Sequence, residues 1–253
     1  MRKIPISIVV THTPQDRKRR KFLSDMEEDL GGVWKIRETV LSYKVLTDPL
    51  MEENQRNRCN RICAERGWRL PYHPDATHVL QLQDDLKVAK GFFRALEQII
   101  EAVPNDIVSL MTLKSYQIGA YERGEYWVNG NGGLTGQAII IPVGKILPMW
   151  DWIDEWLPDV KYYDMPISTW AMVHGEKIWI TCPSIVEHLG ASHSLIGHSN
   201  NRHVAGLFLP DVTHIDFRKM PEKIFNTGTM NHAAHYRSLL EQRREALRVA
   251  GVS

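Results

Sequence analysis

The sequence predicts an α/β protein in which a mostly parallel sheet is flanked by helices, with a loop-rich part and a C-terminal helix. Short apolar runs rich in β-branched residues alternate with longer segments of helical period through the first half of the chain. Glycine and proline residues separate these segments. Because strands that alternate with helices favour βαβ units, we expect most strands to run parallel.

The first strand is expected at residues 4–11, which are apolar and β-branched and precede a break at Thr13-Pro14. Thr13 or Asp16 can cap the helix that follows. This helix begins with a basic run at Arg17 and ends at Gly31-Gly32.

A second strand is expected at residues 39–45, followed by a polar helix over 52–66 that ends at Gly67. Residues 77–82 form a second strong strand pattern, and 92–103 carry one apolar helical face. These elements complete the alternating first half of the chain.

Further short strands are expected at residues 107–110, 138–141 and 177–181. Residues 119–136 are rich in Gly, Tyr and Asn, which predicts a long loop or a hairpin. Residues 165–174 have a helical period. Beyond them, residues 187–232 are expected to be loop-rich and 231–249 to form a final amphipathic helix.

Composition places the chain among ordinary soluble globular proteins. It has 253 residues, 31 Lys+Arg against 30 Asp+Glu, and 43% hydrophobic residues. These values exclude a collagen-like, disordered or disulfide-scaffold chain. We expect one main domain over residues 1–200, with residues 201–253 as a C-terminal extension packed on it. The sequence has no stretch of 18 apolar residues and no signal-peptide pattern, so a cytoplasmic location is expected.

Charge is distributed unevenly along the chain. Residues 1–70 carry 15 basic and 10 acidic groups (net +5), and residues 71–200 carry 8 basic and 15 acidic groups (net −7). Residues 201–253 carry 8 basic and 5 acidic groups (net +3). This pattern fits a site where a cation meets an anionic ligand, and it also fits an ordinary solvated surface.

The strongest chemical signal is Gln83-Asp84-Asp85, directly after an apolar strand. Adjacent carboxylates repel each other, and a divalent cation offsets that repulsion. Mg²⁺ and Mn²⁺ prefer oxygen ligands, usually one or two carboxylates together with substrate phosphates. Since ligands of open α/β sheets lie at the carboxyl ends of strands, the position fits a metal–diphosphate site. The alternative is a solvated Asp-Asp turn or a helix cap.

Three further features could contribute to the same site. His188 follows a short strand and is either a metal ligand or a hydrogen-bonded structural histidine. Asp164 precedes a helix and is either a general base or that helix's N-cap. The glycines of residues 127–137, Gly133 among them, permit close approach of the backbone to a ligand, or they form a hairpin with Asn-Gly turns.

Taken in order, these motifs resemble the GT-A type of nucleotide-sugar-dependent glycosyltransferase. The resemblance covers roughly residues 4–200. Gln83-Asp84-Asp85 looks like the family's acidic metal-binding motif, and Gly91-Phe92-Phe93 looks like the Gly-Phe that follows it. Residues 184–190, which include His188, look like the late segment whose histidine completes the metal shell.

The resemblance implies a GT-A-like catalytic domain over residues 1–200 that transfers a sugar, most simply from a UDP-sugar, to an acceptor hydroxyl. It implies that Asp85 and His188 bind Mn²⁺ or Mg²⁺, with Asp84 helping directly or through water. Asp164 falls where inverting members carry the catalytic base. The expected donor-binding residues are Thr11, Arg17, Asp84 and Gly133.

Two acceptors compete. The resemblance extends to phage-type DNA glycosyltransferases, whose acceptor is a 5-hydroxymethylated pyrimidine; such an enzyme would act in the host cytoplasm. Phosphates would then meet basic residues of the front and tail of the chain, Arg61 and Arg243 among them, and Tyr121, Tyr126 and Trp127 would stack on an extruded base. The second acceptor is a surface glycan or a protein, with Trp150, Trp152 and Trp156 on sugar rings.

Two other classes stay open. A sugar nucleotidyltransferase uses a similar sheet, but it would normally have a glycine-rich loop after the first strand, where this chain has Thr11-His12-Thr13-Pro14. A non-catalytic binding module would tolerate loss of the Asp85 carboxylate. No membrane partner is expected, and the oligomeric state is not determined by the sequence.

Overall fold

The computed structural model describes residues 4–47, 56–112, 116–130, 134–160, 162–189, 204–220 and 232–249. Seven of the described strands form one sheet, in the order β2-β1-β3-β7-β5-β8-β6. Their bounds are β1 Ile4–His12, β2 Val40–Thr47, β3 His78–Gln83, β5 Ile107–Ser109, β6 Trp127–Asn129, β7 Ala138–Pro142 and β8 Ile178–Thr181.

The predicted α/β class with a mostly parallel sheet is confirmed. Among the described strands of this sheet, β7 and β6 run against the other five. The pairs β1–β2, β1–β3 and β5–β8 are parallel. Because β1, β3, β5 and β8 share one direction, their carboxyl ends lie along one edge of the sheet.

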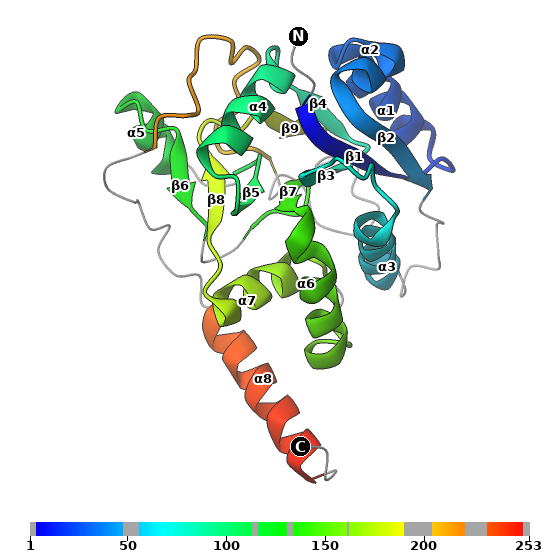
Figure 1. Ribbon diagram of the computed structural model, residues 1–253, viewed down its shortest axis with the longest axis vertical. Coiled ribbons are helices and arrows are strands. Elements are labelled where there is room, and N and C mark those ends of the chain that lie inside the picture. Colours follow the sequence, from blue (N-terminus) through cyan, green and yellow to red (C-terminus); the bar gives the residue numbers. More distant parts are fainter. Residues whose placement is uncertain are drawn as a thin grey trace.

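Helices cover both faces of the sheet (Figure 1). On one face lie the helices α1 Arg17–Asp29, α2 Gly32–Thr39 and α4 Phe92–Ala102. On the other lie α3 Arg56–Arg69, α6 Val143–Trp156, α7 Asp164–His174 and the C-terminal α8 His232–Val249. A short helix, α5 Tyr116–Glu122, precedes β6.

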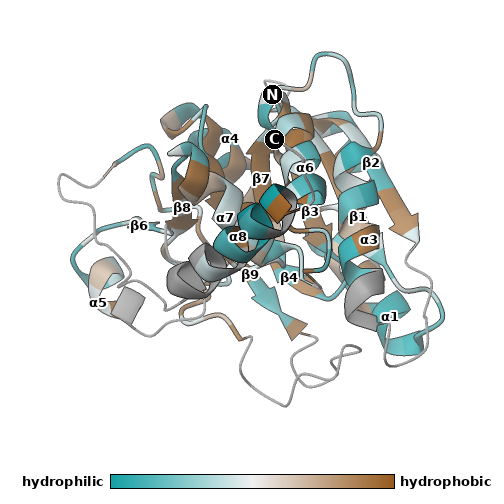
Figure 2. Ribbon diagram, turned by 90° about the horizontal axis from the view of Figure 1, so that it is seen from below, coloured by the Kyte–Doolittle hydropathy of each residue, from teal (hydrophilic) through white to brown (hydrophobic). Residues whose placement is uncertain are grey.

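The alternation of side chains along the strands divides the core between these two faces. In β1, Ile8 and Val10 belong to the core beneath α1 and α4, whereas Val9 belongs to the core beneath α3 and α6. Figure 2 shows hydrophobic ribbon concentrated around β7, β8 and α4, and hydrophilic ribbon on α1 and α8. The sheet is therefore buried on both faces, as a sheet with crossover helices must be.

A small second sheet joins β4 Leu86–Val88 to β9 Val186–His188. The two strands are antiparallel, and their register places Leu86 opposite His188. Because β4 begins directly after Asp85, this pairing brings the late segment of the chain to the end of β3.

Several elements differ from the prediction. The helix α6 spans a segment for which the sequence predicts no regular element, and it contains Pro148. α5 and β6 occupy part of the region expected as a long loop or a hairpin. α3 continues through Gly67 to Arg69 rather than ending at the glycine. A Cβ at position 67 would lie 3.3 Å from atoms of Val9 and Gln81, so this glycine lets α3 pack closely on the sheet.

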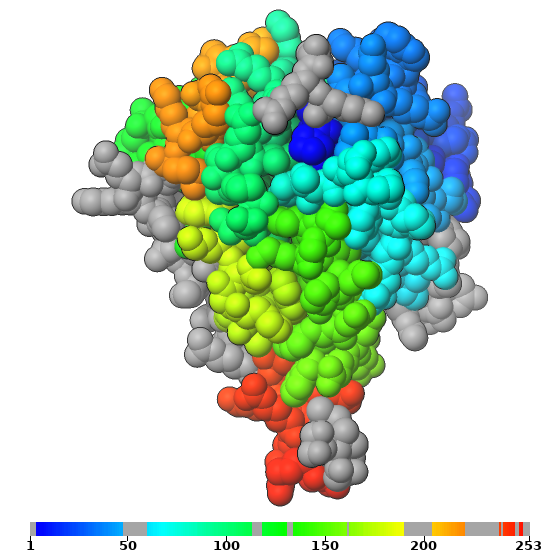
Figure 3. Space-filling model, in the orientation of Figure 1, coloured from blue at the N-terminus to red at the C-terminus, as the bar shows by residue number. Residues whose placement is uncertain are grey.

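The last part of the chain contacts the main body at several points. Phe217 is buried in the core beneath α4, and its carbonyl accepts a hydrogen bond of 2.7 Å from Trp127 Nε1. Leu240 of α8 is buried against the helices of the other face. The rest of α8 projects from the base of the molecule (Figure 3). Among the described helices, none is both long and apolar enough to cross a bilayer.

Candidate active site

The carboxyl ends of β1 and β3 form the floor of the candidate site. The two strands are parallel neighbours, and their register pairs Thr11 with Gln83. Asp84 and Asp85 follow Gln83 and are 3% and 0% exposed. A pair of buried carboxylates is not a solvated turn, so that alternative from the sequence is excluded. Burial of two adjacent negative charges requires compensating partners.

Asp84 is fully engaged by neighbouring groups. Its Oδ2 accepts hydrogen bonds from His12 Nδ1 at 2.7 Å and from the backbone N–H of Thr13 at 3.0 Å. Its Oδ1 accepts from Arg19 Nη1 at 2.8 Å. Since both carboxylate oxygens already have donors, Asp84 ties the loop after β1 to the end of β3.

Asp85 is engaged on one oxygen. Its Oδ2 lies 2.5 Å from Arg19 Nη1 and 2.8 Å from His188 Nε2. Its Oδ1 is buried and has no hydrogen-bond partner among the described residues. Burial by itself would raise the pKa of Asp85, but the Arg19 guanidinium and His188 outweigh it and lower the pKa below its usual value. Asp85 is therefore ionised in the folded chain.

The pairing of β4 with β9 explains why His188 reaches Asp85. Leu86 faces His188 in the register, and the Leu189 N–H donates to the Asp85 carbonyl at 2.8 Å. The two side chains meet although 103 positions separate them in the sequence. The structure thus brings together Asp85 and His188, the two residues predicted as metal ligands.

The helix α1 contributes Arg19 rather than Arg17 to this cluster. Asp16 is the N-cap, and its side chain accepts from the N–H groups of Lys18 and Arg19. Arg19 is buried, whereas Arg17 is exposed at the first position of the helix. Arg19 was not predicted as a site residue. Its spacing from Leu23 and Met26 places it on the apolar face of the helix, and this was the available signal.

Thr11 lies at the same edge, and its Oγ1 donates to the Leu82 carbonyl at 3.3 Å. Gly133 lies outside the described residues. Its neighbour Leu134 is held at the site, because the Leu134 N–H donates to Ser168 Oγ at 3.2 Å. Ser168 Oγ in turn donates to the Asp164 carbonyl at 3.0 Å. The end of the glycine-rich loop is therefore tied to the start of α7.

Asp164 is the first residue of α7, and Tyr163 occupies the N-cap position. The Asp164 Oδ1 accepts from the Met165 N–H at 2.9 Å. Burial raises the pKa of Asp164 to about 6, although hydrogen bonds from the N–H groups of Met165 and Gly136 act in the opposite direction. A carboxyl group with a pKa near neutrality suits a general base.

One hydrogen bond links the acidic motif to Asp164. Gln83 Nε2 donates to Tyr163 Oη at 3.1 Å, and Tyr163 Oη donates to the Gly136 carbonyl. A Cβ at Gly136 would lie 2.7 Å from Tyr163 Oη, so only glycine permits this approach. Hydrogen bonds thus connect the end of β3, the loop before β7 and the start of α7.

The side chains of this cluster supply some of the ligands that a divalent cation needs. The Asp85 carboxylate and the imidazole of His188 supply oxygen and nitrogen ligands of the kind that Mn²⁺ accepts. Within the described ranges, no group of three or more His, Cys, Asp or Glu side chains is arranged to hold a metal by itself. A cation here would complete its shell with water and ligand phosphates, which is the usual arrangement for Mg²⁺.

Some residues that were expected to contact an acceptor have other roles. Trp127 and Trp150 are fully buried, so they are core residues and do not stack on a base or a sugar. Arg61 is also buried and donates to the carbonyls of Leu157 and Pro158, so it does not meet phosphates. Trp152 and Trp156 are part-buried and stacked on each other, with ring centroids 6.2 Å apart.

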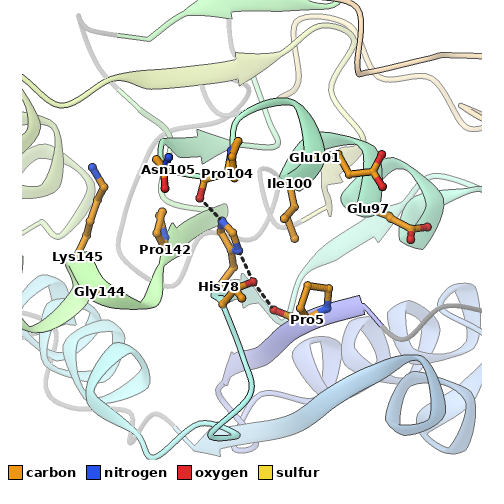
Figure 4. Close-up of a pocket in the computed structure, with 11 residues that line it drawn as sticks. Pro5, His78, Glu97, Ile100, Glu101, Pro104, Asn105, Pro142, Gly144 and Lys145 are labelled. Atoms are coloured by element: carbon orange, nitrogen blue, oxygen red, sulfur yellow. Dashed lines mark hydrogen bonds between the residues drawn. The ribbon is translucent and has the colours of Figure 1, made fainter.

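A cavity of about 660 Å³ lies at the opposite end of the strands (Figure 4). His78, at the start of β3, lines it, but both ring nitrogens already have partners: Thr77 Oγ1 at 2.8 Å and the Pro104 carbonyl at 2.9 Å. Burial lowers the pKa of His78. None of the predicted site residues lines this cavity, so the candidate active site lies at the carboxyl ends of the strands instead.

No protein-family description matches the chain, and no curated protein matches it either. Solved structures with a partly similar shape do exist. A mannose-1-phosphate geranyltransferase from Thermus thermophilus is 12% identical, with 70% of this chain and 74% of that chain covered and a TM-score of 0.36.

Two galactosyltransferases give similar values. The Drosophila β1,4-galactosyltransferase 7, in complex with manganese, UDP-Gal and xylobiose, is 9% identical, covers 87% of this chain and 82% of its own, and has a TM-score of 0.41. The galactosyltransferase LgtC, with donor and acceptor sugar analogues, is 15% identical over 69% and 72% of the chains, with a TM-score of 0.36. At these scores the function must be judged from the residues of the site.

Proposed function

We propose that this chain is a divalent-metal-dependent glycosyltransferase that moves a sugar from a nucleoside diphosphate sugar to an acceptor hydroxyl. The observation that carries the proposal is the meeting of Asp85 and His188 at the carboxyl end of β3. In the same network, a hydrogen bond from Gln83 to Tyr163 leads to Asp164, whose pKa of about 6 suits a base.

In this proposal Asp85 and His188 would hold Mn²⁺ or Mg²⁺, which would also bind the donor diphosphate. The bound cation would neutralise the charge that develops on the leaving nucleoside diphosphate. Thr11 and the start of α1 lie at the same sheet edge, where we propose that the diphosphate binds. The exposed Arg17 and the backbone near Gly133 are the further donor-binding groups we propose.

Asp164 is the proposed catalytic base. Its carboxylate takes the proton of the acceptor hydroxyl while the hydroxyl oxygen forms a bond to the anomeric carbon. The bond from that carbon to the diphosphate oxygen breaks on the opposite face, so the configuration inverts. The electron pair of the broken bond leaves with the nucleoside diphosphate. Such a base contributes about 10²- to 10⁴-fold to the rate.

The acceptor we propose is a 5-hydroxymethylated pyrimidine in DNA. The support is the exposed basic strip Arg17, Lys18 and Arg20 on α1, next to the buried Arg19 of the site. Binding of duplex DNA that weakens steeply between about 50 and 200 mM salt is the expected result. Absence of DNA binding at low salt would remove this acceptor and leave a glycan or protein acceptor.

The first test is thermal stabilisation by nucleotides. The parent chain and the Asp85→Asn variant are heated with UDP, GDP or CMP, each with and without Mn²⁺. We expect UDP to stabilise the parent only when Mn²⁺ is present, by about 2.7 kcal/mol at 100 times its dissociation constant. Asp85→Asn should abolish the effect. A parent chain that no nucleotide stabilises contradicts the proposal.

A further inference from the structure

The Arg19 guanidinium occupies the place between two carboxylates that a cation would need. One nitrogen, Nη1, lies 2.8 Å from Asp84 Oδ1 and 2.5 Å from Asp85 Oδ2. Asp84 and Asp85 directly follow β3, whereas Arg19 comes from the buried face of α1. The positive charge of the site is therefore supplied by the chain itself.

This arrangement leaves two polar atoms unsatisfied. Arg19 Nε and Asp85 Oδ1 are both buried and have no hydrogen-bond partner in the part of the chain that the structure describes. A buried ion pair contributes stability only when its remaining donors and acceptors are also satisfied. The Arg19–Asp85 contact thus neutralises charge without satisfying either group fully.

His188 approaches the same oxygen as Arg19. Its Nε2 lies 2.8 Å from Asp85 Oδ2 and must carry a proton to donate to that carboxylate. Because His188 Nε2 faces Asp85 Oδ2 and not Oδ1, a cation held by both residues would replace this hydrogen bond and the Arg19 contact. Asp85 is 0% exposed, so a cation can reach its carboxylate only if neighbouring groups move.

We propose that Arg19 and a divalent cation exclude each other at the Asp84–Asp85 pair. Arg19 is a positioning residue: its guanidinium keeps the carboxylates folded inward without metal, and it must withdraw from Asp85 before the metal binds. This inference rests on the proposed function, since it concerns the same metal site. It adds a competing positive charge, the Arg19 guanidinium, which the chain itself supplies from α1.

The test measures binding of Mn²⁺ alone, by calorimetric titration, to the parent chain and to Arg19→Met. Methionine keeps the long apolar stem and removes the charge. The matched control is Lys18→Met, which removes one positive charge from an exposed position of the same helix. We expect Arg19→Met to bind Mn²⁺ about tenfold more tightly than the parent, or more, and Lys18→Met to stay within about twofold.

Removing Arg19 leaves two buried carboxylates without their main counter-charge, so the variant could fail to fold without metal. Refolding is then compared in Mn²⁺ and in NaCl of equal ionic strength. Refolding only with Mn²⁺ supports exclusion, because the cation takes over the role of the guanidinium. Failure in both solutions overturns the proposal.

Other results overturn it as well. Arg19 does not compete with the metal if Arg19→Met binds Mn²⁺ no more tightly than Lys18→Met, or does not bind it. The nucleotide experiment separates this outcome from failure of the proposed function. Stabilisation of the parent by UDP with Mn²⁺, without tighter binding in Arg19→Met, leaves the function standing and removes the competition. Tighter Mn²⁺ binding by Arg19→Met, without stabilisation of the parent by any nucleotide, supports the competition and contradicts the proposed function.

Discussion

Gln83 and Tyr163 join the two halves of the candidate site through a hydrogen bond of 3.1 Å from Gln83 Nε2 to Tyr163 Oη. Gln83 ends β3 directly before the acidic pair, and Tyr163 directly precedes Asp164. Tyr163 is buried, and burial raises the pKa of its hydroxyl, so the side chain stays neutral. The position of the proposed base is therefore coupled to the position of the proposed metal ligands.

Replacement of the proposed base should remove most of the activity. Asp164→Asn keeps the shape of the side chain but cannot accept the hydroxyl proton, so we expect kcat to fall about 10²- to 10⁴-fold. The matched control is Asp159→Asn, an exposed carboxylate in the turn before α7, which should change kcat by less than about twofold. A loss below about tenfold in Asp164→Asn would assign the base to another residue.

The rate should depend on pH through the same carboxyl group. Because the pKa of Asp164 is raised to about 6, kcat/KM should fall about tenfold per pH unit below that value. The residual activity of Asp164→Asn should lack this slope. An acid limb centred near pH 4, roughly the ordinary range of an aspartate, would show that burial does not act on the base in the working enzyme.

The stability of the fold should decrease as pH rises, whereas kcat/KM increases. The folded chain binds the Asp164 proton more tightly than the unfolded chain, since the pKa rises from 3.8 to about 6 on folding. The free energy of unfolding contributed by this group is therefore present below pH 3.8 and falls as pH rises to about 6. At pH 7, Asp164→Asn should be more stable than the parent by up to about 3 kcal/mol, the equivalent of a shift of about two pKa units. Denaturant titrations at pH 4 and pH 7 measure the difference.

The close approach of Gly136 to Tyr163 gives a steric prediction. A methyl group in Gly136→Ala would lie 2.7 Å from Tyr163 Oη and from its ring carbon Cζ, so the tyrosine must move. We expect a loss of about 1–3 kcal/mol in unfolding free energy, together with lower kcat. Gly144→Ala is the control, because nothing lies within 4 Å of its Cβ and the helix α6 favours alanine. Equal stability of the two variants would contradict the contact.

Arg61 should matter for stability and not for catalysis. Its Nη1 donates to the carbonyls of Leu157, Pro158 and Val160 at 2.7, 2.9 and 2.6 Å, at the end of α6. Arg61→Met leaves these carbonyls without their charged donor and should cost about 3 kcal/mol, measured by denaturant unfolding. Arg66→Met, exposed on the same helix, should cost less than about 0.5 kcal/mol.

The alternation of strands and helices in the first half of the chain was predictable because most of its elements carry their own local pattern. The first strand, the capping Asp16 and the strand before Gln83 all follow from local sequence. The helix α6 was not predicted, because Pro148 lies inside it and its aromatic residues obscure the apolar face. Tertiary packing of Trp150 and Ile153 stabilises that helix despite the proline.

The candidate site was predictable in its residue types and not in its connections. Asp85 and His188 could be named from the ends of apolar segments, but their contact depends on the pairing of β4 with β9, which no local pattern encodes. Arg19 was missed because an arginine in a basic run reads as a solvated charge. Only the apolar face that it shares with Leu23 distinguishes it from the exposed Arg17.

The register of β4 on β9 makes the candidate metal site a reporter of complete folding. Asp85 lies in the first half of the chain, and His188 reaches it only once β9 has paired with β4. A slip of one residue would turn the histidine to the opposite face and leave the carboxylate alone. A truncated or half-assembled chain would therefore keep its acidic pair yet lack the second ligand, so tight cation binding would mark finished molecules.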